Sequence, residues 1–126
     1  DRHYIPGLVL ASEITYYQGD FTKAQEGIQY LLENEKFLSP GKLYYHNFLV
    51  LLNAEIMVAL GKESRLLRYL SKNLIKDVPL GQKEMEKISD ISEKLKESMQ
   101  NELNNFLKRN YKFINLKKPE QPNSGG

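Results

Sequence analysis

The sequence lacks cysteine and any long hydrophobic run. The absence of cysteine excludes disulfides, thiolate metal sites and a cysteine nucleophile, and it leaves the compartment open, with the cytoplasm favoured. The longest apolar run extends only from Phe48 to Leu52, far short of the roughly 20 residues that a membrane-spanning helix needs. We therefore expect no membrane insertion. Because the chain begins at Asp1 rather than methionine, we expect a fragment of a larger protein or a processed one.

The sequence also has little excess charge of either sign. It contains 18 Lys and Arg against 16 Asp and Glu, a net charge of +2. So small an excess does not by itself indicate a nucleic-acid or membrane partner. The distribution is uneven, because residues 1–60 carry 4 basic and 7 acidic side chains while residues 61–126 carry 14 and 9. A mildly acidic first half thus precedes a basic second half.

Catalytic and metal-binding signatures are missing as well. The two histidines, His3 and His46, have no metal-ligand spacing, and we interpret His46 as a structural residue. The sequence contains no phosphate-binding loop, no nucleophile elbow and no paired-carboxylate motif. We expect a protein that is not an enzyme and that carries neither a cofactor nor a metal.

What the chain does have is apolar residues at helical spacing, which predict five helices. These helices cover about residues 5–18, 21–33, 40–60, 63–76 and 82–109. The third is apolar around much of its circumference, so we expect it at the centre of the core. The fifth has a narrow apolar stripe, as expected of a long helix that caps the end of a stack. Residues 117–126 are rich in Pro, Asn, Ser and Gly and predict a disordered tail.

Two glycines mark turns between helices. Gly19 can take the positive φ that closes a helix, and Asp20 can then act as the N-cap of the next helix. Gly61 lies 42 residues later, again between two amphipathic helices. Helix-turn-helix units at this spacing indicate a stack of repeats.

The residues from Tyr17 to Ala24 resemble the turn of a tetratricopeptide repeat, where that family places glycine, often an acid, an aromatic residue and then a small residue. Around Gly61 the match is partial, with Ala54 and Leu70 at family positions but Leu66 in place of the usual alanine. The resemblance implies an all-α domain over residues 1–116. Two antiparallel units, at about 5–36 and 40–79, would stack as a right-handed solenoid closed by a capping helix at 82–109. The alternative fold is a generic helical bundle.

The resemblance also implies a groove on the inner face of the first helix of each pair, where the chain would bind a peptide or helical segment. Its positions are Val9, Glu13, Tyr16, Tyr17, Leu51, Glu55 and Val58. Family members that grip a C-terminal carboxylate use lysine and asparagine here, whereas this chain has Val9 and Glu13. Tyrosines, aliphatic residues and two acids would suit a segment with apolar anchors and some positive charge. The alternative interpretation is that these residues contact adjoining helices of a longer superhelix.

Four basic side chains share a narrow arc of the fourth predicted helix: Arg65, Arg68, Lys72 and Lys76. They could hold an acidic partner. The alternative is a nucleic-acid-associated helical domain, in which the basic C-terminal half would hold a nucleic-acid backbone. No aromatic or glycine-rich nucleic-acid signature accompanies them, so nucleic acid is the disfavoured partner, and a solvated helix face explains them without any ligand. A third alternative is a structural oligomerisation domain that pairs through residues 82–109.

Overall fold

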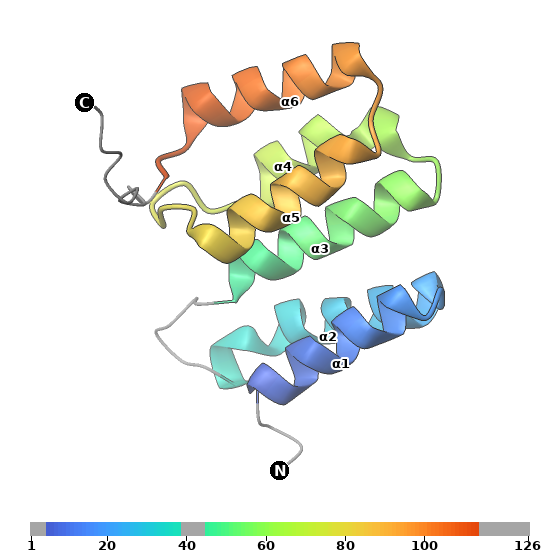
Figure 1. Cartoon of the computed structure of the whole chain (residues 1–126). Helices are drawn as coiled ribbons and strands as arrows, with labels where there is room; N and C mark the ends of the chain where they lie inside the picture. Colours follow the sequence, from blue (N-terminus) through green and yellow to red (C-terminus); the bar gives the residue numbers. More distant parts are fainter. Residues whose placement is uncertain (1–4, 39–44, 114–126) are drawn as a thin grey trace, which may run out of the picture.

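The computed structural model describes residues 5–38 and 45–113, and within these ranges the fold is all-α. The elements are α1 (Ile5–Tyr17), α2 (Phe21–Leu38), α3 (His46–Ala59), the short 3-10 helix η1 (Glu63–Arg65), α4 (Leu66–Asn73), α5 (Gln82–Glu93) and α6 (Glu97–Asn110). In Figure 1, α1 and α2 lie at one end of the molecule and α6 at the other, with α3, α4 and α5 between them. None of the helices in the described ranges is both long and apolar enough to cross a bilayer.

The turns after α1 and α3 have the same geometry. Gly19 has φ 88° and Gly61 has φ 80°, as predicted for helix-closing glycines. In each turn the glycine N–H donates to the carbonyl three residues earlier, and the following N–H donates to the carbonyl five residues earlier. The bonds are Gly19 to Tyr16 (2.9 Å), Asp20 to Thr15 (3.2 Å), Gly61 to Val58 (2.9 Å) and Lys62 to Met57 (2.8 Å). This pair of bonds defines the Schellman motif, which satisfies the free carbonyls of a helix end.

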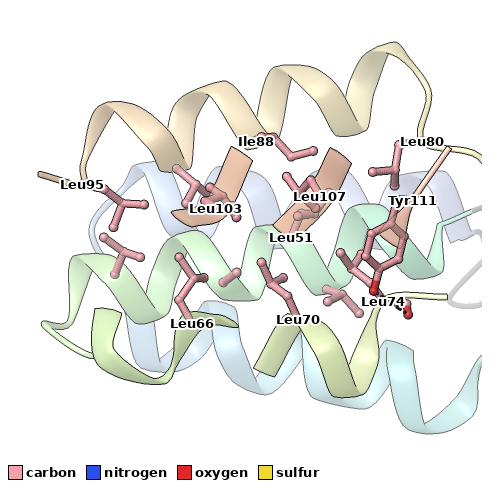
Figure 2. Close-up of a cluster of buried hydrophobic side chains, with 14 residues drawn as sticks. Leu51, Leu66, Leu70, Leu74, Leu80, Ile88, Leu95, Leu103, Leu107 and Tyr111 are labelled. Carbon is pink, nitrogen blue, oxygen red and sulfur yellow. Dashed lines mark hydrogen bonds between the residues drawn. The ribbon is translucent and has the colours of Figure 1, made fainter. Parts of the chain in front are cut away.

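Helix α3 is the central element, as predicted, because it contributes to two buried clusters. The first joins it to α1 and α2 and contains Val9, Tyr16, Ala24, Ile28, Leu31, Phe48, Leu49, Leu52 and Ile56. The second, shown in Figure 2, joins it to α4, α5 and α6 and includes Leu51, Val58, Leu66, Leu70, Ile88, Ile91, Leu103 and Leu107. An apolar surface on opposite sides is what a helix needs when other helices cover it on both sides.

The prediction of one capping helix at 82–109 is wrong, because the structure has two helices there. α5 ends at Glu93, and Leu95 then turns into the core, where it is 7% exposed. The Gln100 Nε2 group of α6 donates to the carbonyl oxygens of Ser92 (2.7 Å) and Leu95 (3.2 Å). A side chain of the second helix thus satisfies carbonyls at the end of the first. Neither glycine nor proline marks this turn in the sequence.

Other element bounds differ less from expectation. α2 continues to Leu38, and the fourth helix begins with the 3-10 turn η1 and ends at Asn73. The Leu80 N–H donates to the Lys112 carbonyl at 2.8 Å, beside an isolated parallel bridge between Leu80 and Phe113. This contact ties the segment after α6 to the loop before α5. The predicted start of the third helix at residue 40 and the predicted tail at 117–126 lie outside the described residues.

Candidate partner-binding surface

The structure places the seven predicted groove residues on α1 and α3, where they divide by exposure. Five are buried: Val9, Tyr16, Leu51, Glu55 and Val58. Leu51 and Val58 lie in the cluster to which α5 contributes, so the chain itself covers them. Tyr17 is 62% exposed and Glu13 is partly exposed. Partner binding at these positions stays a prediction. Of the predicted groove, only Tyr17 and Glu13 are accessible to a partner.

A buried carboxylate, Glu55, lies where α1, α3 and α5 meet. Its Oε1 atom accepts a hydrogen bond from Lys87 Nζ at 2.9 Å. Its Oε2 atom accepts one from Tyr16 Oη and one from Lys94 Nζ, each at 2.9 Å. Because an unpaired buried charge is costly, these three donors make the burial of Glu55 tolerable and fix how α1 and α5 sit on α3. We call these four residues the Glu55 network.

Lys87 connects the Glu55 network to the molecular surface. Its ammonium group donates to Tyr17 Oη at 3.2 Å and to Asp90 Oδ2 at 3.4 Å. It also lies 5.4 Å from the centroid of the Tyr17 ring and 5.9 Å from that of Phe48, within the range of cation–π attraction. One buried cation is therefore held by two carboxylates and two aromatic rings.

The electrostatics of the Glu55 network favour fixed protonation states. Burial acts to raise the pKa of Glu55, but hydrogen bonds from Lys94, Lys87 and Tyr16 outweigh it and hold that pKa below its ordinary value. Burial acts to lower the pKa of Lys87, but the hydrogen bonds to Glu55 and Tyr17 outweigh it and raise that pKa. Burial and the hydrogen bond to Glu55 both raise the pKa of Tyr16. Each pKa moves away from neutrality, the reverse of what acid–base catalysis requires, so we interpret the network as structural.

The network reaches solvent along one edge of the molecule. Besides Tyr17, the side chains of Asp90 and Lys94 are 42% and 38% exposed. Glu13 lies one turn before Tyr17 on the same side of α1. We call these four residues the Tyr17 edge. It presents an aromatic ring flanked by charges of both signs.

Sequence reasoning missed the three residues that α5 and the following turn supply: Lys87, Asp90 and Lys94. They looked like solvent-facing charges on a long surface helix, and their partners lie far away in the chain. Two features of the sequence indicate the two lysines among them. Glu55 interrupts an otherwise apolar helix, and Lys87 and Lys94 are seven residues apart, which places two lysines on one helix face.

Three of the four residues of the predicted basic arc line a surface hollow of about 810 Å³. Arg65, Arg68 and Lys72 line it, together with Met57, Ser64, Tyr69 and Asn73, whereas Lys76 is not part of the lining. Tyr69 Oη accepts a hydrogen bond from Asn53 Nδ2 at 2.9 Å. Burial raises the pKa of Tyr69, although that hydrogen bond opposes it. We call Arg65, Arg68 and Lys72 with this hollow the basic hollow.

Comparisons with known proteins add no assignment. No family model, no curated protein and no solved structure matches the chain. Over residues 5–38 and 45–113, no group of three or more His, Asp or Glu side chains could hold a metal ion. Function has to be inferred from the geometry of the chain itself.

Proposed function

We propose that this chain is a non-catalytic interaction module that holds a peptide or helical segment of a partner protein against the Tyr17 edge. The observation that carries the proposal is that Tyr17 is 62% exposed while its hydroxyl group is hydrogen-bonded to Lys87 of the buried Glu55 network. Tyrosine anchors dominate many protein interfaces, because the ring offers a large contact area with few rotatable bonds.

The position of Tyr17 is set before any partner arrives. Its hydroxyl oxygen accepts a hydrogen bond from Lys87, and its ring centroid lies 5.0 Å from that of Tyr16. A side chain that is already ordered loses little further entropy on binding. Glu13 and Asp90 beside it favour a segment with an apolar residue against the ring and a basic residue nearby.

The finer fold is part of the same proposal: a solenoid-like stack that resembles tetratricopeptide repeats, with the right-handed sense that the resemblance implies. What supports it is the pair of matching turns at Gly19 and Gly61, 42 residues apart. The split of the expected capping helix into α5 and α6 supplies a third helix pair in chain order. In such a stack the first helices of each pair, α1, α3 and α5, share the inner face, and the Glu55 network joins these three.

A peptide library displayed on phage and selected against the full chain tests the proposed surface. We expect selected peptides to bind the wild-type chain and to lose about tenfold or more in affinity to Tyr17→Ala, measured by calorimetry. Tyr30→Ala is the matched control, because Tyr30 is also an exposed tyrosine, on α2, at 48%. Peptides that bind Tyr17→Ala as tightly as wild type, or that depend equally on Tyr30, would show that the Tyr17 edge is not the binding surface.

A second candidate function is binding of an acidic protein segment at the basic hollow. It is favoured because Arg65, Arg68 and Lys72 line one concavity, and no salt bridge within the described residues neutralises them. A salt titration with a poly-glutamate peptide, a single-stranded and a double-stranded oligonucleotide separates the partner classes. We expect the peptide to bind and the replacement of all three residues by glutamine to abolish binding. Preferential binding of an oligonucleotide at moderate salt would instead identify a nucleic-acid partner.

A further inference from the structure

Two large aliphatic side chains on α1 face solvent. Leu10 is 55% exposed and Ile14 is 47% exposed, and they lie one helical turn apart on the same face. The opposite face of α1 is the one that enters the core, through Val9 and Tyr16. α1 is therefore apolar on both sides, as α3 is, although only one side of it is covered within the described residues.

The matching turns place α1 and α3 in register. With Gly19 set on Gly61, Leu10 falls on Leu52, Ile14 on Ile56 and Glu13 on Glu55. All four pairs are identical residues. Leu52 and Ile56 are 0% exposed, because they pack on the α1–α2 hairpin in the cluster that contains Ala24 and Ile28. The same residue types in the same positions are thus covered by a helix hairpin in α3 and exposed to solvent in α1.

We propose that Leu10 and Ile14 form a docking site for an antiparallel helix hairpin of a partner protein, one that presents the small and branched apolar side chains of the α1–α2 hairpin. The α1–α2 hairpin of a second copy does not meet this need, since its apolar face is already filled by α3. The site adjoins the Tyr17 edge and shares Glu13 with it. Tyr17 itself is not part of the site, because its counterpart in the register, Ala59, is exposed.

The register also assigns a polar contact to the partner. Glu55 accepts a hydrogen bond from Tyr16 Oη, a donor that lies on the preceding hairpin. Glu13 holds the same position in the first unit and is partly exposed. The docking hairpin is therefore expected to carry a hydroxyl or other donor opposite Glu13, at the place that Tyr16 has in α1.

The test is a chain in which residues 5–46 occur twice in tandem, followed by the rest of the protein. The added hairpin then meets Leu10 and Ile14 of the original copy with the spacing that the native hairpin has to Leu52 and Ile56. We expect Tm to rise by about 5 °C or more over the native chain, since stability in stacked repeats grows with each interface. We also expect the α1 amides of the original copy to exchange more slowly with solvent.

Three variants make the tandem result specific. Leu10→Glu with Ile14→Glu in the original copy should remove the gain in Tm while hardly changing Tm of the native chain, because both side chains are exposed there. Leu60→Glu with Val78→Glu, two other exposed aliphatic residues, should leave the gain intact. Tyr16→Phe in the added copy alone should reduce the gain, because it removes the donor to Glu13.

The proposal is overturned if the tandem chain gains no stability, or if the gain survives the Leu10 and Ile14 replacements. Sedimentation of the native chain over a wide concentration range provides an independent readout, for which we expect a monomer. Self-association that the same two replacements abolish would identify a second copy as the occupant and would also overturn the proposal.

Discussion

Lys87 Nζ lies 2.9 Å from Glu55 Oε1, and the two side chains are 4% and 2% exposed. This ion pair is the only salt bridge within the described residues in which both partners are buried. Buried pairs seldom add much net stability, because desolvation offsets the attraction between the charges. Their effect is on geometry, since any arrangement that separates the two charges is penalised. The pair therefore fixes the position of α5 relative to α3.

The first prediction concerns the difference between removing one member of this ion pair and removing both. Glu55→Leu should lower the free energy of unfolding by about 3–5 kcal/mol, because it removes the buried carboxylate partner of Lys87 and leaves only the longer ion pair with the part-exposed Asp90, at 3.4 Å. The double variant Glu55→Leu with Lys87→Met should lose markedly less, because no buried charge remains. Urea unfolding of Glu55→Leu, of Lys87→Met and of the double variant measures the coupling energy between the two residues. Equal losses in the single and double variants would mean that the pair does not control the packing of α5.

The second prediction concerns pH. The folded pKa of Glu55 lies below its unfolded value of about 4.5, so its contribution is present above that value and is lost as the pH falls through the folded pKa. The pKa values of Lys87 and Tyr16 are raised above 10.5 and 10.0, so their contributions are present below those values and are lost as the pH rises past them. Unfolding free energies measured across pH should show both limbs. Glu55→Gln should flatten the acid limb, and an unchanged slope would contradict this account.

The third prediction separates conformational strain from steric space at a turn. A side chain at Gly19 would meet nothing within 4 Å, but φ is 88°, where residues with a Cβ atom are strained. Gly19→Ala should therefore destabilise the protein by about 1–2 kcal/mol. Gly19→Asn should cost less, because asparagine tolerates this conformation best after glycine. Thermal and urea unfolding of both variants measure the difference; equal losses would indicate a cause other than backbone conformation.

The fourth prediction tests the turn between α5 and α6. Gln100→Ala removes the amide that bonds the carbonyl oxygens of Ser92 and Leu95, and it should lower the free energy of unfolding by about 1–2 kcal/mol. Hydrogen exchange should accelerate at the end of α5. Gln82→Ala, whose amide bonds only the exposed Glu86, is the control and should change little. Matching effects of the two replacements would show that the bonds from Gln100 do not hold the turn.

Local patterns were enough to predict the all-α class, the turns at Gly19 and Gly61 and the central place of α3. Each of these depends on backbone chemistry or on periodicity within one helix. The break after Glu93 was invisible, because it is made by Leu95 packing into the core and by the side chain of Gln100, and no residue there is a helix breaker. The Glu55 network was invisible for a related reason. Lys87 and Lys94 look like surface lysines until the fold brings α5 onto α3.

The groove positions show the same limit. Val9, Leu51 and Val58 were predicted as contacts for a partner from the resemblance to tetratricopeptide repeats, and the structure covers them with the chain's own side chains. Periodicity identifies an apolar face but not what will cover it. Conversely, the exposure of Leu10 and Ile14 could not be anticipated, because their pattern is that of a buried stripe.

Since α3 is shared by both buried clusters, neither half of the molecule keeps a complete core when the other unfolds. Leu32 reinforces the link, because it packs against both clusters from α2. We expect the described helices to unfold in a single cooperative transition, with the α3 amides exchanging only through global opening. Mechanical or proteolytic disruption of α1–α2 would then also destabilise α4 and α6, because both halves pack on one common helix, α3.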